Sequence, residues 1–239
     1  MKIVTTAIGI IPLALILGCS NPADKVPGAE VRSSTNPPIE SAKAEQSDRY
    51  FAFGPSLGSI AFTGSKVTGR HQGGFRNFAG EFKVANGKLA DAGNKILIDT
   101  SSLWADNDRL TGHLKGPDFF NVAQFPTATF ISTSIEPKET NSLVTGNLTL
   151  HGVTKQISFP AKVQAAEDGV TVSAQFFINR FDFEIRFPGK ANDLIRKEVV
   201  LKLEVKSAPG RADFAALEQA ASSVAAAPAA ARPPAPRRP

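Results

Sequence analysis

The sequence predicts an all-β domain, an antiparallel β-barrel of about eight strands with a short helical insertion. Apolar and polar residues alternate with a period of two through the middle of the chain, most clearly at residues 170–178 and 199–205. Turn-forming runs such as Ala166-Glu167-Asp168-Gly169 separate these segments closely, which favours hairpins over helical crossovers. An open antiparallel sheet of this size would expose two edges, and closure into a barrel removes them.

Eight segments carry the strand pattern, and in the clearest of them one face is apolar while the other carries Thr, Ser, Gln, Lys or Glu. In chain order the predicted strands are residues 58–63, 75–84, 96–99, 128–135, 144–150, 155–163, 170–178 and 199–205. A second turn-forming run, Ala85-Asn86-Gly87-Lys88, closes the second of these strands.

The helical insertion is predicted at residues 101–124, where the alternation fails. Leu103, Leu110 and Leu114 have helical spacing, and Gly112 and Pro117 break the segment into short pieces. An apolar cluster without strand period follows at residues 119–125. Such a cluster suits a cover over one end of a barrel.

Phenylalanine dominates the aromatic residues, with 17 Phe against one Trp and one Tyr. The Phe ring carries no polar group, so this composition favours a dry interior. An eight-stranded barrel is filled by its own side chains or holds one small apolar ligand. The sequence leaves both alternatives open.

Both ends of the chain differ in composition from the middle. Residues 1–18 combine Lys2 with an apolar run, which is typical of a signal peptide. Ile16-Leu17-Gly18-Cys19 matches a bacterial lipobox, so we expect lipidation at Cys19, a membrane anchor that includes a fatty acyl chain such as palmitate, and a flexible tether at residues 19–47. The barrel domain is expected at residues 48–207.

Residues 208–239 are rich in Ala, Pro and Arg and predict a disordered tail, within which a short helix near residues 213–227 would end at Pro228. The tail carries part of the formal net charge of +5. Because that charge lies outside the barrel, it gives little support to nucleic-acid binding, and no nucleic-acid partner is expected.

Three stretches of the barrel region carry recognisable motifs: SKVTGRHQGGFRNFAGEF from Ser65, HLKGPDFFNVAQFPTATF from His113 and GNLTLHGVTKQISFPA from Gly146. Together they resemble the YceI-like family of periplasmic lipid-binding β-barrels, and the likeness extends over about residues 50–206. Asn179-Arg180 and Asp182-Phe183 resemble a further family element. Glu184 stands where the family usually has glycine, which would permit an unusual backbone angle.

The resemblance implies an extended, lipocalin-like barrel with a long internal channel that holds a polyisoprenoid or another long amphiphile. It also implies a binding protein that needs no cofactor, and that the chain can form a homodimer. The residues expected to contact the lipid are Phe62, Phe78, Phe82, Phe119, Phe120, Phe130, Leu148, Phe176 and Ile178.

Two polar residues are candidates for contact with the head group of such a lipid. His151 and Lys155 flank a turn between two predicted strands, where a cation would suit a phosphate or carbonyl group. The alternative is a solvated hairpin turn. No spacing of His71, His113 and His151 is typical of a metal site, so no metal is expected.

Asp106, Asp108 and Asp118 lie near His113 in the sequence, the minimum for acid–base chemistry. Caps of short helical turns explain these carboxylates better, and no catalytic motif is present. We therefore expect a non-enzyme that binds, stores or shuttles a lipid.

The expected location is the bacterial cell envelope, with the protein facing the periplasm or the cell surface. Ser20 after the lipobox favours the outer membrane. Two other functions remain open: a filled-barrel scaffold that presents its basic tail to an envelope partner, and an enzyme that modifies a lipid.

Overall fold

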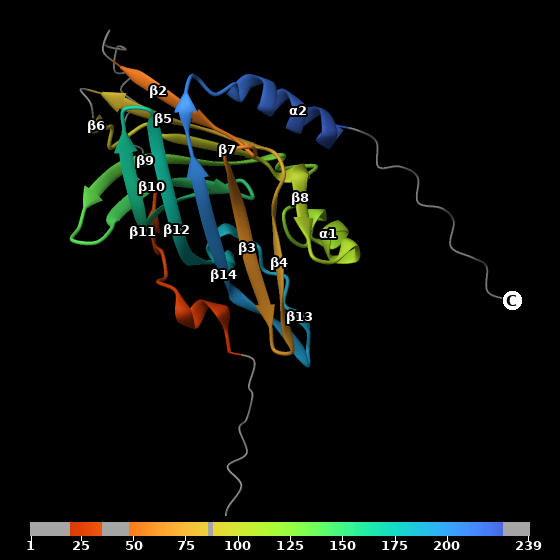
Figure 1. Ribbon diagram of the computed structural model, residues 1–239. Coiled ribbons are helices and arrows are strands. Elements are labelled where there is room, and N and C mark those ends of the chain that lie inside the picture. The colour runs from red at the N-terminus through yellow and green to blue at the C-terminus, as the bar shows by residue number, and fades with distance from the viewer. Residues whose placement is uncertain (1–19, 35–47, 86–87, 227–239) are drawn as a thin grey trace, which may run out of the picture.

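The computed structural model describes residues 20–34, 48–85 and 88–226 of the 239-residue chain (Figure 1). Within these residues the fold is dominated by β-strands, with two α-helices and three 3-10 turns. The helices are α1 (Asp108–Lys115) and α2 (Phe214–Ala226), and the 3-10 turns are η1 (Pro22–Lys25), η2 (Thr100–Ser102) and η3 (Arg180–Phe183). None of the described helices is long and apolar enough to span a bilayer.

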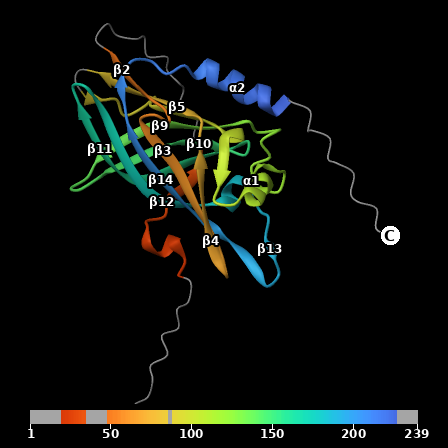
Figure 2. The same ribbon diagram turned by 45° about the vertical axis from the view of Figure 1, so that its right-hand side comes forward.

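The strands are β1 (Glu30–Ser33), β2 (Arg49–Phe53), β3 (Gly58–Lys66), β4 (Gly69–Phe75), β5 (Phe78–Ala85), β6 (Lys88–Leu89), β7 (Lys95–Asp99), β8 (Leu103–Ala105), β9 (Thr127–Pro137), β10 (Ser142–Leu150), β11 (Val153–Ala166), β12 (Gly169–Asn179), β13 (Gly189–Lys190), β14 (Asp193–Lys206) and β15 (Ala208–Pro209). They form a mainly antiparallel, strongly curled sheet (Figures 1 and 2), which confirms the predicted all-β barrel class.

The predicted number of about eight strands is wrong, because the described residues form fifteen. The predicted strand at residues 75–84 corresponds to β5, except that Phe75 is the last residue of β4, a strand that was not predicted. The chain bends between β4 and β5, where the backbone N–H groups of Arg76 and Asn77 bond to the carbonyl and the hydroxyl of Ser102. The predicted helical segment is also shorter than expected, since Leu103 lies in strand β8 and only α1 completes regular helical turns.

The curled sheet returns to its starting strand through β14. The pairing order runs β2, β5, β7, β9, β10, β11, β12 and β14, and β14 continues through Ser207 into β15, which pairs with β2. The Ser207 hydroxyl accepts a bond from the Val170 N–H at 2.8 Å and donates one to the Val170 carbonyl at 3.0 Å. These bonds hold the bend between β14 and β15 against the start of β12.

The segment before the matched barrel is folded, so the flexible tether predicted at residues 19–47 is wrong for residues 20–34. β1 pairs with β11, and Ala29 N–H donates to the Phe177 carbonyl of β12 at 2.8 Å. Residues 27–33 therefore occupy the seam where β11 and β12 diverge, with Val31 packed against the core. β1 is stabilised by backbone pairing. A strand of four residues is too short to show a period of two in the sequence, so the prediction missed it.

The disordered tail predicted at residues 208–239 is wrong for its first half. β15 and α2 are folded, and Leu217 and Ala221 of α2 are buried. Arg211 donates to the buried Glu81 carboxylate at 2.7 Å, which joins the tail to β5. The expected short helix near residues 213–227 is confirmed. The predicted signal peptide, Cys19, the turn residues 86–87 and residues 227–239 lie outside the described residues.

Buried apolar side chains gather in two clusters. The main cluster gathers buried side chains of β2, β5, β10, β11 and β12, together with Phe183 of η3 and Val205 of β14. The second cluster joins Phe62 of β3 to α1 and to the loop that follows it, and it includes Leu114 and Phe119. The predicted cover of residues 119–125 thus contributes to a separate, filled cluster.

A buried arginine fixes the junction between η3 and β14. The side chain of Arg180 is 4% exposed, and burial lowers its pKa. Its guanidinium donates to four backbone carbonyl oxygens, those of Ile185 at 2.6 Å, Phe187 at 2.7 Å, Arg196 at 3.1 Å and Ile195 at 3.2 Å. This one side chain therefore holds both the loop after η3 and the start of β14.

Glu184 adopts a left-handed backbone conformation (φ 59°) at the end of η3. This geometry explains why glycine suits the position, since other residues pay roughly 1–2 kcal/mol in this region. The Glu184 carboxylate forms a two-point ion pair with Arg186 at 2.7 and 3.0 Å. Glu184 therefore keeps the left-handed conformation that glycine favours, and the departure from glycine leaves the fold intact.

We predict that Arg180→Met lowers the free energy of unfolding by about 2–4 kcal/mol, because several buried carbonyls lose their donor. Urea denaturation followed by circular dichroism measures this loss. Arg186→Met is the control: its partner is Glu184, both side chains are more than half exposed, and its effect on stability should be much smaller than that of Arg180→Met. Equal losses in the two variants would contradict this role for Arg180.

Candidate functional site

An apolar cavity lies inside the curled sheet, against the main cluster. Its wall comes from strands on several sides of the barrel, including β5, β9, β10, β11, β12 and β14, and it is partly open to the outside. Its volume is about 120 Å³. By the same measure, a cavity that holds one water molecule needs roughly 10–15 Å³. The barrel is therefore hollow in part, which resolves the choice between a filled and a hollow interior.

Four of the nine residues expected to contact a lipid line this cavity: Phe82, Phe130, Leu148 and Phe176. The other five do not. Phe78 and Ile178 are buried in the main cluster without facing the cavity. Phe62, Phe119 and Phe120 belong to the second cluster, where their rings pack against neighbouring apolar side chains.

The structure adds apolar wall residues that the sequence-based prediction omitted. The main ones are Ile60, Ile96, Ile98, Val144, Ile157 and Phe159. Alternation on β10 and β11 could have indicated three of them, because Val144, Ile157 and Phe159 share the inward face with Leu148. The two isoleucines of β7 lie in a short strand whose facing the sequence does not define.

Three phenylalanine rings follow one another along the wall. Phe159 and Phe176 stack with ring centroids 4.0 Å apart and planes at 12°, and Phe130 lies 5.7 Å from Phe159 in a tilted arrangement. The Phe130 ring lies over Gly146 on β10, whose missing side chain leaves room for it. This aromatic wall offers contact area to a hydrocarbon chain and no hydrogen bonds.

The buried polar residues at the cavity are already bonded within the protein. Asn94 donates to the Ser132 hydroxyl at 2.9 Å and to the Ala90 carbonyl at 2.7 Å, and its side-chain oxygen accepts from the Lys83 N–H at 3.0 Å. These bonds fix the loop before β7 to β9. The polar pair therefore has a structural role, and the recognition surface of the cavity is apolar.

The two expected head-group residues lie near the turn between β10 and β11, and both are close to Glu184. His151 has a positive φ of 52° in the turn between β10 and β11, packs on Phe125 and bonds to the Phe183 carbonyl at 3.2 Å. Lys155 is opposite Leu148, so it is on the inward face of β11, two residues from the cavity residue Ile157. Neither His151 nor Lys155 lines the cavity.

The charge of Lys155 acts on Glu184. The pKa of the Glu184 carboxyl is lowered first by its hydrogen bond with Arg186, and nearby Lys155 and His151 lower it further. A cluster of charged side chains thus lies at the end of the barrel closed by η3.

The acid–base candidates form two separate exposed pairs. His71 Nδ1 lies 2.8 Å from Asp106 Oδ1, and His113 Nε2 lies 2.8 Å from Asp118 Oδ2. Asp106 thus pairs with His71, and neither pair lines the cavity. In the described part of the chain, no three His, Cys, Asp or Glu side chains gather in a way that could hold a metal ion.

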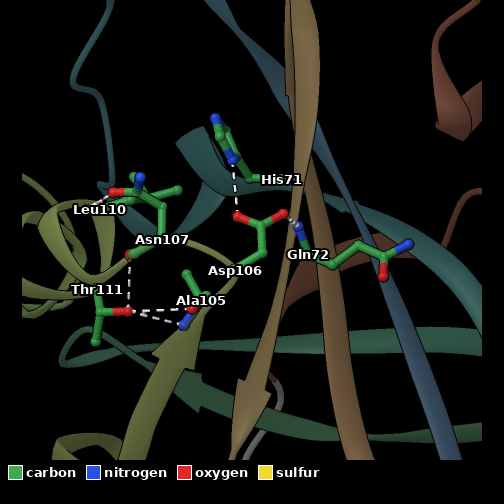
Figure 3. A network of polar contacts seen from close by, with 7 residues as sticks. All are labelled: His71, Gln72, Ala105, Asp106, Asn107, Leu110 and Thr111. Carbon is green, nitrogen blue, oxygen red and sulfur yellow. Dashed lines mark hydrogen bonds and ion pairs between the residues drawn. The ribbon is translucent and has the colours of Figure 1, made fainter.

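The network around Asp106 joins β4 to the start of α1 (Figure 3). Asp106 Oδ2 accepts from the Gln72 N–H at 2.9 Å, and the Asp106 N–H returns a bond to the Gln72 carbonyl. Asn107 caps α1 by accepting from the Leu110 N–H at 3.0 Å, and the Thr111 hydroxyl bonds back to the segment before the helix. The carboxylate therefore works as a structural clamp.

A curled antiparallel barrel around a cavity with a predominantly apolar lining defines a lipocalin-like barrel protein. The chain belongs to the YceI-like family, whose model, a YceI-like domain, matches residues 51–207. This confirms the resemblance drawn from the three sequence motifs.

Curated relatives in other bacteria agree with the family assignment. A UPF0312 protein of Pseudomonas putida (strain W619) is 30% identical over 134 residues, which cover 53% of this chain and 70% of the relative. A UPF0312 protein of Vibrio campbellii is 34% identical over 128 residues, which cover 51% of this chain and 68% of the relative.

Two solved structures share the fold. BcnA of Burkholderia cenocepacia aligns with a TM-score of 0.57 at 23% identity, over 62% of this chain and 95% of BcnA. A polyisoprenoid-binding domain from Saccharophagus degradans, implicated in plant cell wall breakdown, aligns with a TM-score of 0.55 at 17% identity, over 68% of this chain and 99% of that domain.

We predict an acid-dependent loss of stability at Asp106, whose pKa is lowered, mainly by the Gln72 N–H and also by His71. Because the folded pKa lies below the unfolded value of about 3.9, the stabilisation is present above that pH and disappears as the pH falls through the folded pKa. Urea midpoints of wild type and Asp106→Asn should therefore differ most at pH values well above about 3.9, and the difference should shrink as the pH falls below that value.

Asp168→Asn, in the exposed turn between β11 and β12, is the control for this experiment. A gap between wild type and Asp106→Asn that stays constant down to about pH 2.5 would contradict the clamp.

Proposed function

We propose that this protein binds, stores or shuttles a long-chain polyisoprenoid or a similar amphiphile, with the apolar chain inside the barrel. The observation that carries the proposal is the hollow, apolar cavity with its aromatic wall of Phe130, Phe159 and Phe176. Each buried methylene of a ligand contributes about 0.8 kcal/mol, so a chain needs few polar contacts. The polyisoprenoid-binding domain of similar fold supports this ligand class.

The cavity favours a carrier over the two other functions considered. A scaffold with a filled barrel has no need of an open apolar space. An enzyme that modifies a lipid would place reactive groups against its substrate, whereas the His–Asp pairs described above lie outside the cavity wall. The membership of the YceI-like family agrees with a binding role.

The proposed location is the bacterial cell envelope, with Cys19 carrying the lipid anchor. The support comes from the signal-like residues 1–18 and the lipobox, together with Ser20, which favours the outer membrane. Two or more acyl chains would be needed for stable anchoring. Formation of a homodimer stays a prediction from the family resemblance.

We predict that protein purified from its native host carries an amphiphile that mass spectrometry of organic extracts identifies.

Val172→Phe, which adds a ring inside the cavity wall, should weaken uptake of a labelled isoprenoid roughly tenfold, because losing space for about two methylenes costs about 1.6 kcal/mol. Gln175→Phe adds the same ring to the exposed outer face of β12 and should bind normally. Extracts without any amphiphile, together with equal uptake by both variants, would refute the carrier function.

Lys155 is our candidate for contact with an anionic head group, since it extends the inward face of β11 beyond the cavity. We predict that Lys155→Ala weakens binding of an isoprenoid phosphate about three- to tenfold and leaves the corresponding alcohol unaffected. Lys162→Ala removes an exposed lysine from the opposite face of the same strand and is the matched control. Equal affinity of Lys155→Ala and wild type for both ligands would exclude the contact.

A further inference from the structure

Two hairpin tips at one end of the barrel expose a pair of large apolar side chains. Val67, in the turn between β3 and β4, is 54% exposed, and Leu194, at the start of β14, is 50% exposed. The two residues are neighbours, because the Val67 N–H donates to the Leu194 carbonyl at 3.3 Å. Single exposed apolar residues are common on protein surfaces, but adjacent ones on projecting tips need an explanation.

Basic residues surround this apolar pair. Lys66 and Arg70 flank the β3–β4 turn, and Lys190 lies in the adjoining hairpin of β13 and β14. The acidic residue at these tips, Asp193, is occupied by Lys66 at 2.5 Å and by the Thr68 N–H and hydroxyl. The tips therefore combine exposed apolar groups with a net positive charge, as surfaces that contact anionic lipid do.

The N-terminal segment is held at the same end of the molecule. The Ser65 hydroxyl of β3 donates to Asn21 Oδ1 at 3.3 Å, Ala23 of η1 is buried, and η1 packs against β14. Figures 1 and 2 both show η1 and the tips of β3, β4 and β13 at one end and α2 at the other. Cys19 precedes Asn21 by two positions, which is at most about 7 Å of extended chain.

We propose that the tips formed by residues 65–70 and 189–195 contact the surface of the bilayer to which the protein is anchored. This inference rests on the proposed lipidation of Cys19, which would bring the same end of the barrel within a few ångströms of the membrane. Val67 and Leu194 then enter the head-group region, while Arg70 and Lys190 meet lipid phosphates. We favour the bilayer as the partner of this surface for two reasons: the anchor would lie close to the tips, and the positive charge of the tips suits anionic lipid.

The orientation also determines how far the cavity lies from the membrane. On β3, the cavity residue Ile60 precedes the tip residue Lys66 by six residues, or about 20 Å of extended strand. The cavity-bearing half of the barrel and α2 therefore face away from the bilayer, toward an incoming donor or acceptor of lipid.

The test uses the acylated full-length chain, in which Cys19 is the single cysteine and is blocked by its lipid. Val67→Cys and the control Val224→Cys, on the exposed face of α2, each introduce one free thiol for a bimane label. The labelled proteins are reconstituted into vesicles of phosphatidylethanolamine and phosphatidylglycerol that carry brominated acyl chains. Bromine should quench the label at position 67 at least roughly twofold and leave position 224 unaffected, since interfacial groups reach about 5–10 Å into the lipid.

The outcomes separate this inference from the anchoring on which it rests. Vesicle flotation with equal quenching at the two positions, or with none at position 67, leaves the anchor intact and overturns the proposed orientation. Cross-linking of position 67 to a protein instead of quenching by lipid also overturns it. A mature chain without an acyl group on Cys19, which does not float with vesicles, refutes the anchor and the orientation together.

Discussion

The backbone pairing that returns the sheet to its first strand is the constraint on which the rest of the structure depends. β14 pairs with β12 on one side and β3 on the other, and beyond Ser207 the same chain pairs with β2 as β15. This continuity encloses the main cluster without a covering layer of helices. It also covers part of the edge that β2 would otherwise expose, through the pairs Ala208–Ala52 and Pro209–Phe51. The cavity exists because the sheet returns on itself around a core that does not fill it.

Small and large residues are interspersed on the inward face of the sheet. Ala161 and Ala174 are opposite each other on β11 and β12, and both are buried between larger residues of the same strands. On β10, Gly146 has no side chain, and the Phe130 ring occupies the space that a side chain would need. Large rings stack at some inward positions and small residues occupy others, so the wall is rigid but not space-filling. The second cluster has one small residue, Ala105, among larger apolar side chains such as Phe62 and Phe119.

Alternation in the sequence predicts the strands well because it depends only on which face of the sheet each residue occupies. It does not define the depth of a residue along the barrel. Phe78 and Phe82 both belong to the main cluster, yet only Phe82 reaches the cavity. That difference depends on the curvature of the sheet and on the side chains that strands distant in sequence place beside each ring. Phe119 and Phe120 were expected at the lipid for their apolar character, but α1 and β3 cover them.

Contacts with distant strands also decide the structure of the segment that precedes the family domain. The family match begins at residue 51, and nothing in residues 20–34 has the periodicity of a strand. Their fold is set by neighbours: β11 residues 155–158 and Phe177 of β12 would otherwise present unpaired backbone groups at the seam where the two strands diverge. The backbone of residues 27–33 pairs with these groups, and one apolar side chain, Val31, packs against the core. The region next to Cys19 is therefore part of the barrel wall, and an anchor attached there would restrict the orientation of the whole barrel.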